Sequence, residues 1–172
     1  MIPKIKKILY ATDLSKNSAY ALRYAVNSAK RNDAEIVILH VVEMIDTSTY
    51  NFMAAQIGEK LVAEKAKERE DDAKDRIKKR LKVFYNKVRS EDPEFKDPKV
   101  LTEICMGYPA EEILRTADEL NCDMIIMGTH GKGIVSQTFL GSMAKKVLGR
   151  TRKPVFIIPL PKEESDLTSH DI

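Results

Sequence analysis

The chain of 172 residues predicts one domain over residues 1–161 and a polar tail over 162–172 that we expect to be disordered. Hydrophobic residues make up 43% of the chain and charged residues 32%, so a full core can be buried. The formal net charge of +3 comes from interspersed charges, which argues against a nucleic-acid partner. No apolar run approaches the roughly 20 residues of a membrane helix, and the start lacks a signal peptide, so we expect a cytoplasmic protein.

The N-terminal part predicts strand, helix and strand. Residues 4–10 form an apolar strand, and residues 14–31 show helical spacing with Ser15 as the N-cap. Residues 35–42 are an almost continuous apolar run, IVILHVV, which indicates a central strand of a parallel sheet covered on both faces.

Residues 43–57 show no clear period, and we expect a loop or frayed segment there. Residues 59–88 predict a long helix with one apolar line and dense charge elsewhere. Opposite charges lie four residues apart on it, namely Glu70 with Lys74 and Asp72 with Arg76. A surface for a partner or for nucleic acid is one interpretation of this charge, and a solvated helix face is the simpler one.

The C-terminal half continues the alternation. Residues 90–98 predict a turn, residues 99–106 a strand, and a helix begins at Pro109 and runs to about residue 120. A short buried strand follows over residues 124–127. After a glycine-rich loop come a short helix over 143–148, opened by Gly141 and Ser142, and a last strand over 155–158.

Strands that alternate with helices predict a parallel α/β sheet with helices on both faces. Ligands of such sheets bind outside the carboxyl ends of the strands, at the topological switch point. Asp13 follows the first strand, Val41 lies at the end of the second, and Gly128 ends the fourth. We therefore expect these residues at one edge of the sheet.

The glycine loop predicts a phosphate site, because glycines permit close backbone approach and helix N-termini attract anions. Neither of the two best-known phosphate motifs fits. No Ser or Thr follows Lys132 as a P-loop requires, and the spacing of Gly128, Gly131 and Gly133 is not that of the dinucleotide fingerprint.

The spacing that fits is G-x2-G-x9-G-[ST], formed by Gly128, Gly131, Gly141 and Ser142. This motif resembles the nucleotide motif of the universal stress protein family, in its ATP-binding branch. The resemblance covers most of the chain and also rests on the segments KKILYATDLS, VILHVVE and MGYPAEEIL, in that order.

The resemblance implies a five-stranded parallel sheet in three layers, with the Rossmann-like fold of the adenine nucleotide alpha hydrolases. It implies that Asp13 lies beside the adenosine, although a turn or N-cap residue is an equal interpretation. It also implies that the Val41 backbone reads the adenine edge, and that the glycine loop and the start of the following helix hold the phosphates. The implied nucleotide contacts are Ala11, Thr12, Asp13, Val41, Met127, Gly128, Thr129, His130, Gly131, Lys132, Gly133, Ile134, Gly141, Ser142 and Met143.

The expected ligand is ATP, or AMP or ADP, and a Mg²⁺ or Mn²⁺ ion would be carried by the phosphates with few protein ligands. Ala11 departs from a proline that is frequent in relatives. The histidines His40, His130 and His170 are too scattered for a metal cluster, and His40 is expected to be a half-buried imidazole with its hydrogen bonds satisfied. We expect Cys105 and Cys122 to be buried free thiols.

No catalytic constellation appears in the sequence, so a binding protein is favoured over an enzyme. The first hypothesis is an ATP-binding regulator or sensor of the stress response. A slow ATPase or nucleotidyl transferase is the second, and an interaction module with an incidental nucleotide is the third. The apolar run 155–158 should be an edge strand, and in the family this strand pairs with its twin, so we expect a homodimer.

Overall fold

The computed structural model describes residues 3–44, 46–91, 93, 96–129 and 140–159. Glycine-loop residues 130–139 and the predicted tail 162–172 lie outside the described residues. The elements are β1 (Lys7–Ala11), α1 (Lys16–Asn32), β2 (Glu35–Glu43), α2 (Thr47–Ile57), α3 (Glu59–Glu91), β3 (Val100–Gly107), α4 (Pro109–Glu119), β4 (Met124–Gly128), α5 (Ser142–Leu148) and β5 (Val155–Ile158).

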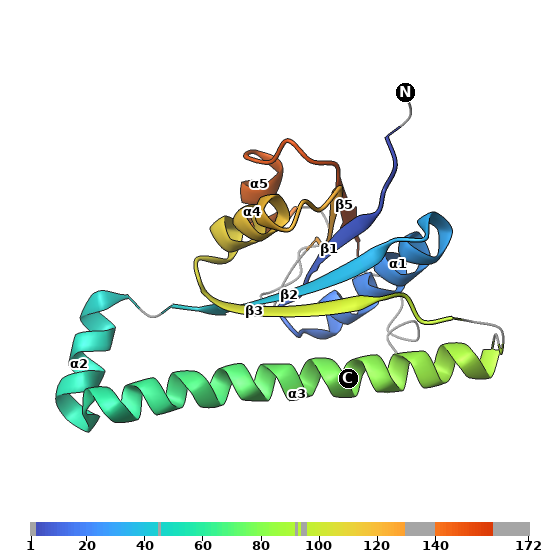
Figure 1. The fold of residues 1–172 in the computed structure, drawn as a ribbon. Helices are drawn as coiled ribbons and strands as arrows, with labels where there is room; N and C mark the ends of the chain where they lie inside the picture. Colours follow the sequence, from blue (N-terminus) through green and yellow to red (C-terminus); the bar gives the residue numbers. More distant parts are fainter. Residues whose placement is uncertain (1–2, 45, 92, 94–95, 130–139, 160–172) are drawn as a thin grey trace.

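The five strands form one parallel sheet in the order β3-β2-β1-β4-β5, as the alternating pattern predicts (Figure 1). β1 lies in the middle, pairing with β2 on one side and β4 on the other. The chain winds outward from β1 in both directions, so the boundary between β1 and β4 is the switch point of the sheet.

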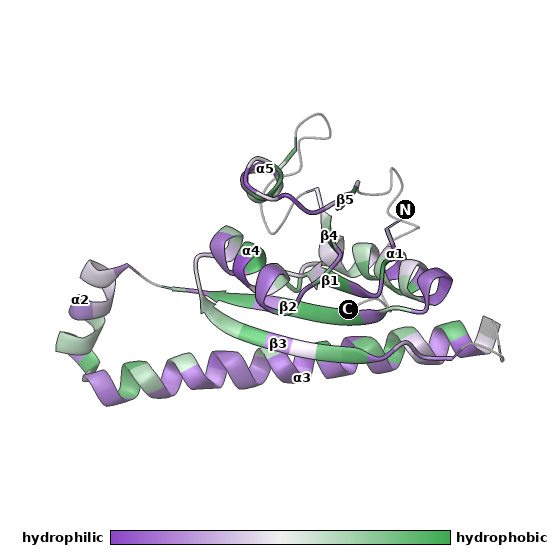
Figure 2. Cartoon of the chain, turned by 45° about the horizontal axis from the view of Figure 1, so that its top comes forward, coloured by the Kyte–Doolittle hydropathy of each residue, from purple (hydrophilic) through white to green (hydrophobic). Residues whose placement is uncertain are grey.

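Helices cover both faces of the sheet, which gives three layers (Figure 1). Side chains alternate along a strand, so Ile8 and Tyr10 of β1 point to one face and Leu9 to the other. The first face packs against α1 and α3, and the second against α4 and α5. The strands carry the apolar residues and the helices are amphipathic or charged, as Figure 2 shows.

The long helix α3 is confirmed, and it extends three residues past the predicted end at residue 88. The apolar cluster between the first face of the sheet and helices α1 and α3 is called the first core, and the cluster on the second face is called the second core. Ala73, Ile77 and Tyr85 are the buried residues that α3 contributes to the first core. The predicted ion pair of Glu70 with Lys74 forms, with a distance of 2.6 Å between Oε1 and Nζ. Most of the remaining residues of α3 are exposed, in agreement with a solvated helix face. Figure 2 shows that much of this helix is hydrophilic.

The expectation of a loop over residues 43–57 is wrong, because residues 47–57 form α2. Asp46 caps this helix by accepting a hydrogen bond from the Thr49 N–H at 3.0 Å. α2 buries no residue, and Phe52 is 67% exposed. A helix without a buried face needs no apolar period, so the pattern that identifies the other helices is missing here.

The turn before α1 also differs from its prediction. Residue 14 was expected to begin the helix, but Leu14 has a φ of 62° and lies outside α1. Ser15 is the N-cap as predicted, and its Oγ accepts from the Ser18 N–H at 3.2 Å. The other predicted elements are present, with ends that differ by a few residues. Within the described residues, no helix has the length and apolar character needed to cross a bilayer.

Candidate functional site

A pocket of about 690 Å³ opens at the carboxyl ends of the strands, beside the switch point between β1 and β4. Its volume is typical of a site for a small molecule. Every predicted site residue that the structure describes lines it, namely Ala11, Thr12, Asp13, Val41, Met127, Gly128, Thr129, Gly141, Ser142 and Met143. His130, Gly131, Lys132, Gly133 and Ile134 lie outside the described residues.

Asp13 uses its two carboxylate oxygens differently. Oδ1 accepts hydrogen bonds from the N–H and the hydroxyl of Ser15, at 3.0 and 2.6 Å. Oδ2 is buried and has no hydrogen-bond partner within the described part of the chain. Buried polar atoms in native proteins are normally paired, so an orphaned oxygen in a pocket wall indicates an acceptor for a ligand or a water. The turn role is therefore present, and it leaves one oxygen available.

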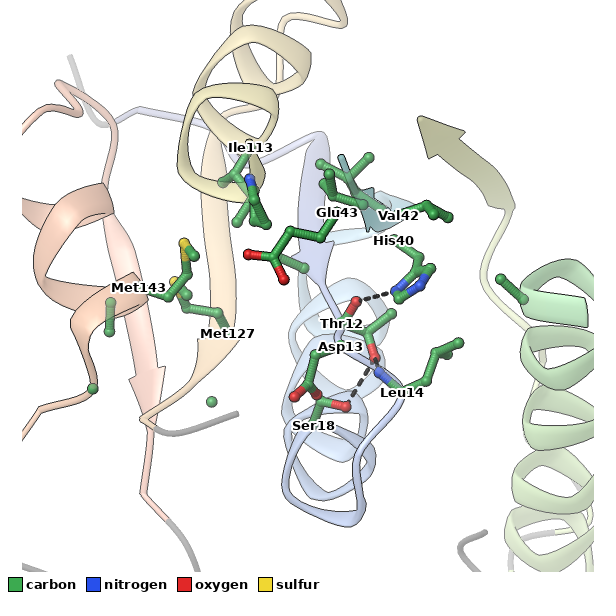
Figure 3. Close-up of a pocket in the computed structure, with 18 of the residues that line it drawn as sticks. Thr12, Asp13, Leu14, Ser18, His40, Val42, Glu43, Ile113, Met127 and Met143 are labelled. Carbon is green, nitrogen blue, oxygen red and sulfur yellow. Dashed lines mark hydrogen bonds between the residues drawn. The ribbon is translucent and has the colours of Figure 1, made fainter. Parts of the chain in front are cut away.

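Thr12 and His40 link the ends of β1 and β2. The Thr12 hydroxyl donates to the Ser18 Oγ at 2.9 Å and accepts from the Leu14 N–H at 3.1 Å. The His40 Nδ1 lies 2.8 Å from the Thr12 carbonyl oxygen (Figure 3). The predicted satisfied imidazole is confirmed, but His40 is buried rather than half-buried, with 9% of its surface exposed. These hydrogen bonds hold in place the part of the pocket wall that Thr12 and His40 form.

Val41 lies where the ladder between β1 and β2 has ended. The last bond of this ladder runs from the Thr12 N–H to the Leu39 carbonyl, at 2.9 Å. Backbone groups of residues two apart point to the same side of a strand, so the N–H and C=O of Val41 face the side that β1 has left. The backbone of Val41 therefore presents a donor and an acceptor toward the pocket.

The opposite end of the pocket is formed by the end of β4 and the start of α5. Gly128 ends the strand, and the Gly141 N–H donates to the Thr129 carbonyl at 2.9 Å. The Gly141 N–H is thus already hydrogen-bonded, so it is not free to donate to a phosphate, although Gly141 was among the predicted nucleotide contacts. Ser142 and Met143 begin α5, where N–H groups have no intrahelical acceptor.

Sequence reasoning missed several lining residues. Glu43, at the end of β2, directs its carboxylate into the pocket (Figure 3). α3 adds Arg69, Asp72, Ala73 and Arg76. Ala73 was part of the predicted apolar line, and Arg69 and Arg76 lie four and three positions from it, so the helical period could have placed them on the same face. Asp72 directly precedes Ala73 and lies three and four positions from Arg69 and Arg76.

Across the described ranges, no group of three or more His, Cys, Asp or Glu side chains is placed to hold a metal ion. Cys122 is buried as predicted, Cys105 is half-buried, and both are free thiols. Neither cysteine lines the pocket.

Comparisons with known proteins agree with this architecture. The model of the Universal stress protein family matches residues 4–159. Universal stress protein MJ0531 of Methanocaldococcus jannaschii is 33% identical over 92% of this chain and 85% of its own length. Universal stress protein MJ0577 of the same organism is 30% identical over 89% of this chain and 94% of its own length.

The solved structures show the same fold. The structure of MJ0577 has a TM-score of 0.65 and 27% identity, and it covers 94% of this chain and 100% of its own. A match of the family model over nearly the full length, together with relatives at 30% identity or more, shows the family. The chain belongs to the universal stress protein family.

Proposed function

We propose that the chain binds an adenine nucleotide, with ATP as its ligand, and that it acts as a nucleotide-dependent regulator in the stress response. One observation carries the proposal. The pocket at the switch point brings the orphaned Asp13 Oδ2 and the open backbone of Val41 together with Gly128 and the start of α5. This set offers an acceptor for a sugar hydroxyl, an edge for a base and a place for phosphates.

The base would be recognised by the backbone of Val41. Adenine carries a donor at N6 where guanine carries an acceptor at O6. A backbone C=O accepts from the adenine amino group and repels the guanine oxygen. ATP should therefore bind more tightly than GTP.

The phosphates would lie at the opposite end. Gly128 has no side chain to obstruct them, and the N–H groups of Ser142 and Met143 remain available as donors. The Ser142 side chain is exposed and lines the pocket, so its hydroxyl can add a further donor. The sequence-predicted contribution of residues 131–134 belongs to the same proposal.

Fold relatives with ligands support the proposal at the level of the fold. One universal stress protein structure is in complex with cAMP, and one from Arabidopsis thaliana has AMP bound. They are only 19% and 16% identical to this chain, so they show that the fold accommodates such ligands. A divalent ion would enter with the phosphates, because Mg²⁺ keeps its waters and uses phosphate oxygens readily.

Mass spectrometry of the denatured purified protein tests the proposal first. Co-purified ATP, followed by calorimetric binding of ATP that exceeds binding of GTP, is the expected result. Release of ADP or AMP would instead support slow hydrolysis. If no nucleotide is released and neither ATP, ADP nor AMP produces binding heat, the proposal fails and an interaction module is favoured.

A further inference from the structure

The carbonyl group of Leu14 receives two guanidinium groups from the distant helix α3. Nη2 of Arg76 donates to this oxygen at 3.2 Å, and Nη2 of Arg80 donates at 3.0 Å. The donors lie 62 and 66 residues along the chain from their acceptor. No other described backbone carbonyl of the turn before α1 is held in this way by α3.

The turn that these arginines hold is not one that its sequence favours. Leu14 has a φ of 62°, in the left-handed region that a leucine side chain disfavours. Such a conformation persists only where the surroundings hold it. Leu14 is 5% exposed, and its N–H is bound to the Thr12 hydroxyl, so contacts on both sides of the residue fix it.

Asp13 directly precedes Leu14, and its side chain is hydrogen-bonded to Ser15, the residue that follows Leu14. Its Oδ1 is bound to Ser15, its buried Oδ2 has no partner among the described residues, and Asp13 is one of the residues that line the pocket. A change of the Leu14 backbone would rotate the peptide group that joins the two residues. The orientation of the Asp13 carboxylate thus depends on the conformation of Leu14, and through Leu14 on α3.

We propose that Arg76 and Arg80 are positioning residues for the nucleotide, which act through the Leu14 carbonyl and couple the position of α3 to the occupancy of the pocket. The inference rests on the proposed function. Arg76 also lines the pocket, together with Ala73 one turn before it. The side of α3 that faces the pocket therefore contacts both the ligand space and the turn that orients Asp13.

Thermodynamic linkage fixes the sign of the coupling between ligand binding and the position of α3. A ligand that favours the ordered turn also favours the docked position of α3, and docking of α3 raises the affinity for the ligand by the same factor. α2 and the first turns of α3 extend beyond the edge of the sheet (Figure 1). Movement of α3 would reach this projecting arm, which gives an exposed surface that differs between the empty and the occupied protein.

The test replaces both arginines, Arg76→Gln with Arg80→Gln, in the full chain. The matched control is Lys78→Gln with Lys82→Gln, because it removes the same charge at the same spacing from exposed positions that do not contact Leu14. Calorimetry with ATP should show affinity about tenfold weaker in the arginine variant and unchanged in the control. Arg76→Lys with Arg80→Lys should recover part of the loss, because an ammonium group can also donate to a carbonyl.

Amide hydrogen exchange separates coupling from simple loss of stability. In the wild type, ATP should slow exchange both in the turn at residues 13–18 and in α3 over residues 73–84. In the arginine variant at saturating ATP, the turn should still be protected while α3 no longer responds. A residue that only stabilises the fold would lower protection with and without ATP and would leave the response of α3 to ATP intact.

The outcomes distinguish this inference from the proposed function. Unchanged ATP affinity and an unchanged α3 response in the arginine variant would overturn the inference alone. The same holds if the lysine control is equally impaired, or if ATP binds the wild type without any effect on α3. A wild type that binds neither ATP, ADP nor AMP would overturn both. Should circular dichroism show that the double variant is unfolded, the single change of the exposed Arg76 to Gln is judged by the same criteria.

Discussion

The imidazole Nδ1 of His40 lies 2.8 Å from the carbonyl oxygen of Thr12. A carbonyl oxygen only accepts, so Nδ1 is the nitrogen that carries the proton in this contact. The bond joins β1 to β2 directly past their last shared backbone hydrogen bond. It engages the carbonyl of the residue that directly follows β1 with a side chain of β2, one position before Val41.

Replacement of Asp13 by Asn tests the orphaned oxygen. Asn keeps an acceptor for the Ser15 N–H at 3.0 Å but places an amide donor where Oδ2 now lies. ATP affinity should fall on the order of 10- to 100-fold, as expected for the loss of a hydrogen bond to a charged group. The midpoint of thermal unfolding should change little. The control is Asp118→Asn, whose carboxylate is on the surface 3.3 Å from the Lys153 Nζ; equal affinity of both variants would remove Asp13 from the site.

Replacement of Ser142 by Ala should weaken ATP more than AMP. The hydroxyl is exposed at the first residue of α5, where the outer phosphates are proposed to lie. The loss for ATP should be roughly 1.5–3 kcal/mol of binding free energy. Because the side chain is exposed, the free energy of unfolding should stay constant. Equal losses for ATP and AMP, measured by calorimetry, would place Ser142 away from the outer phosphates.

Replacement of Ile77 by Ala tests the docking of α3 on the sheet. Ile77 is 3% exposed and belongs to the first core. Truncation of a buried isoleucine should lower the free energy of unfolding by about 2–5 kcal/mol. Val83→Ala on the same helix is the control, since Val83 is 40% exposed and should change it by less than about 0.5 kcal/mol. Urea denaturation compares the two, and similar losses would mean that α3 does not pack as described.

The predicted homodimer is tested with a substitution on the exposed side of β5. β5 is an edge strand, as expected, and Phe156 is 53% exposed on it. Ile157 packs against the second core, so a lysine there would disturb the fold as well as an interface. Phe156→Lys should give a folded monomer, while Leu101→Lys on the opposite edge strand β3 should leave the dimer intact. Light scattering that finds a wild-type monomer at micromolar concentration would contradict the prediction.

Burial raises the pKa of the Cys122 thiol to about 11, from an ordinary value of 9.0. The folded state therefore favours the neutral thiol. This contribution to stability is fully present below about pH 9 and is lost as the pH rises through about 11. The free energy of unfolding should fall more steeply over this range in the wild type than in Cys122→Ala. Parallel pH profiles would show that Cys122 is not shielded from water.

The sequence predicts the sheet and one end of the pocket well, because both leave local patterns. Apolar runs identify β2 and β4, and parallel pairing then brings their carboxyl ends to one edge. The spacing of the glycines is also a local pattern, because it reflects the geometry of the backbone and not contacts between distant residues. It correctly predicts that Gly128 and Gly141 line the pocket.

Features that depend on distant contacts leave no such pattern. The left-handed backbone conformation of Leu14 is held by hydrogen bonds from Arg76 and Arg80, and the sequence around Leu14 contains no pattern that predicts these contacts. α2 escapes prediction because it buries no residue and so has no apolar period. The sequence does not predict that Arg69, Asp72 and Arg76 of α3 line the pocket, because charged residues on a long helix usually face solvent.

The central place of β1 has a consequence for synthesis. Ile8 is in register with Met124, and the backbone N–H groups of Lys6 and Lys7 donate to the Asp123 carboxylate. The side of β1 that pairs with β4 therefore stays unpaired until residues 124–128 have been synthesised and have left the ribosome. At typical rates of translation the wait is on the order of ten seconds. β4 and α5 line the pocket, so a nascent chain lacks part of the site for the proposed nucleotide, and only a finished molecule would be stabilised by that ligand.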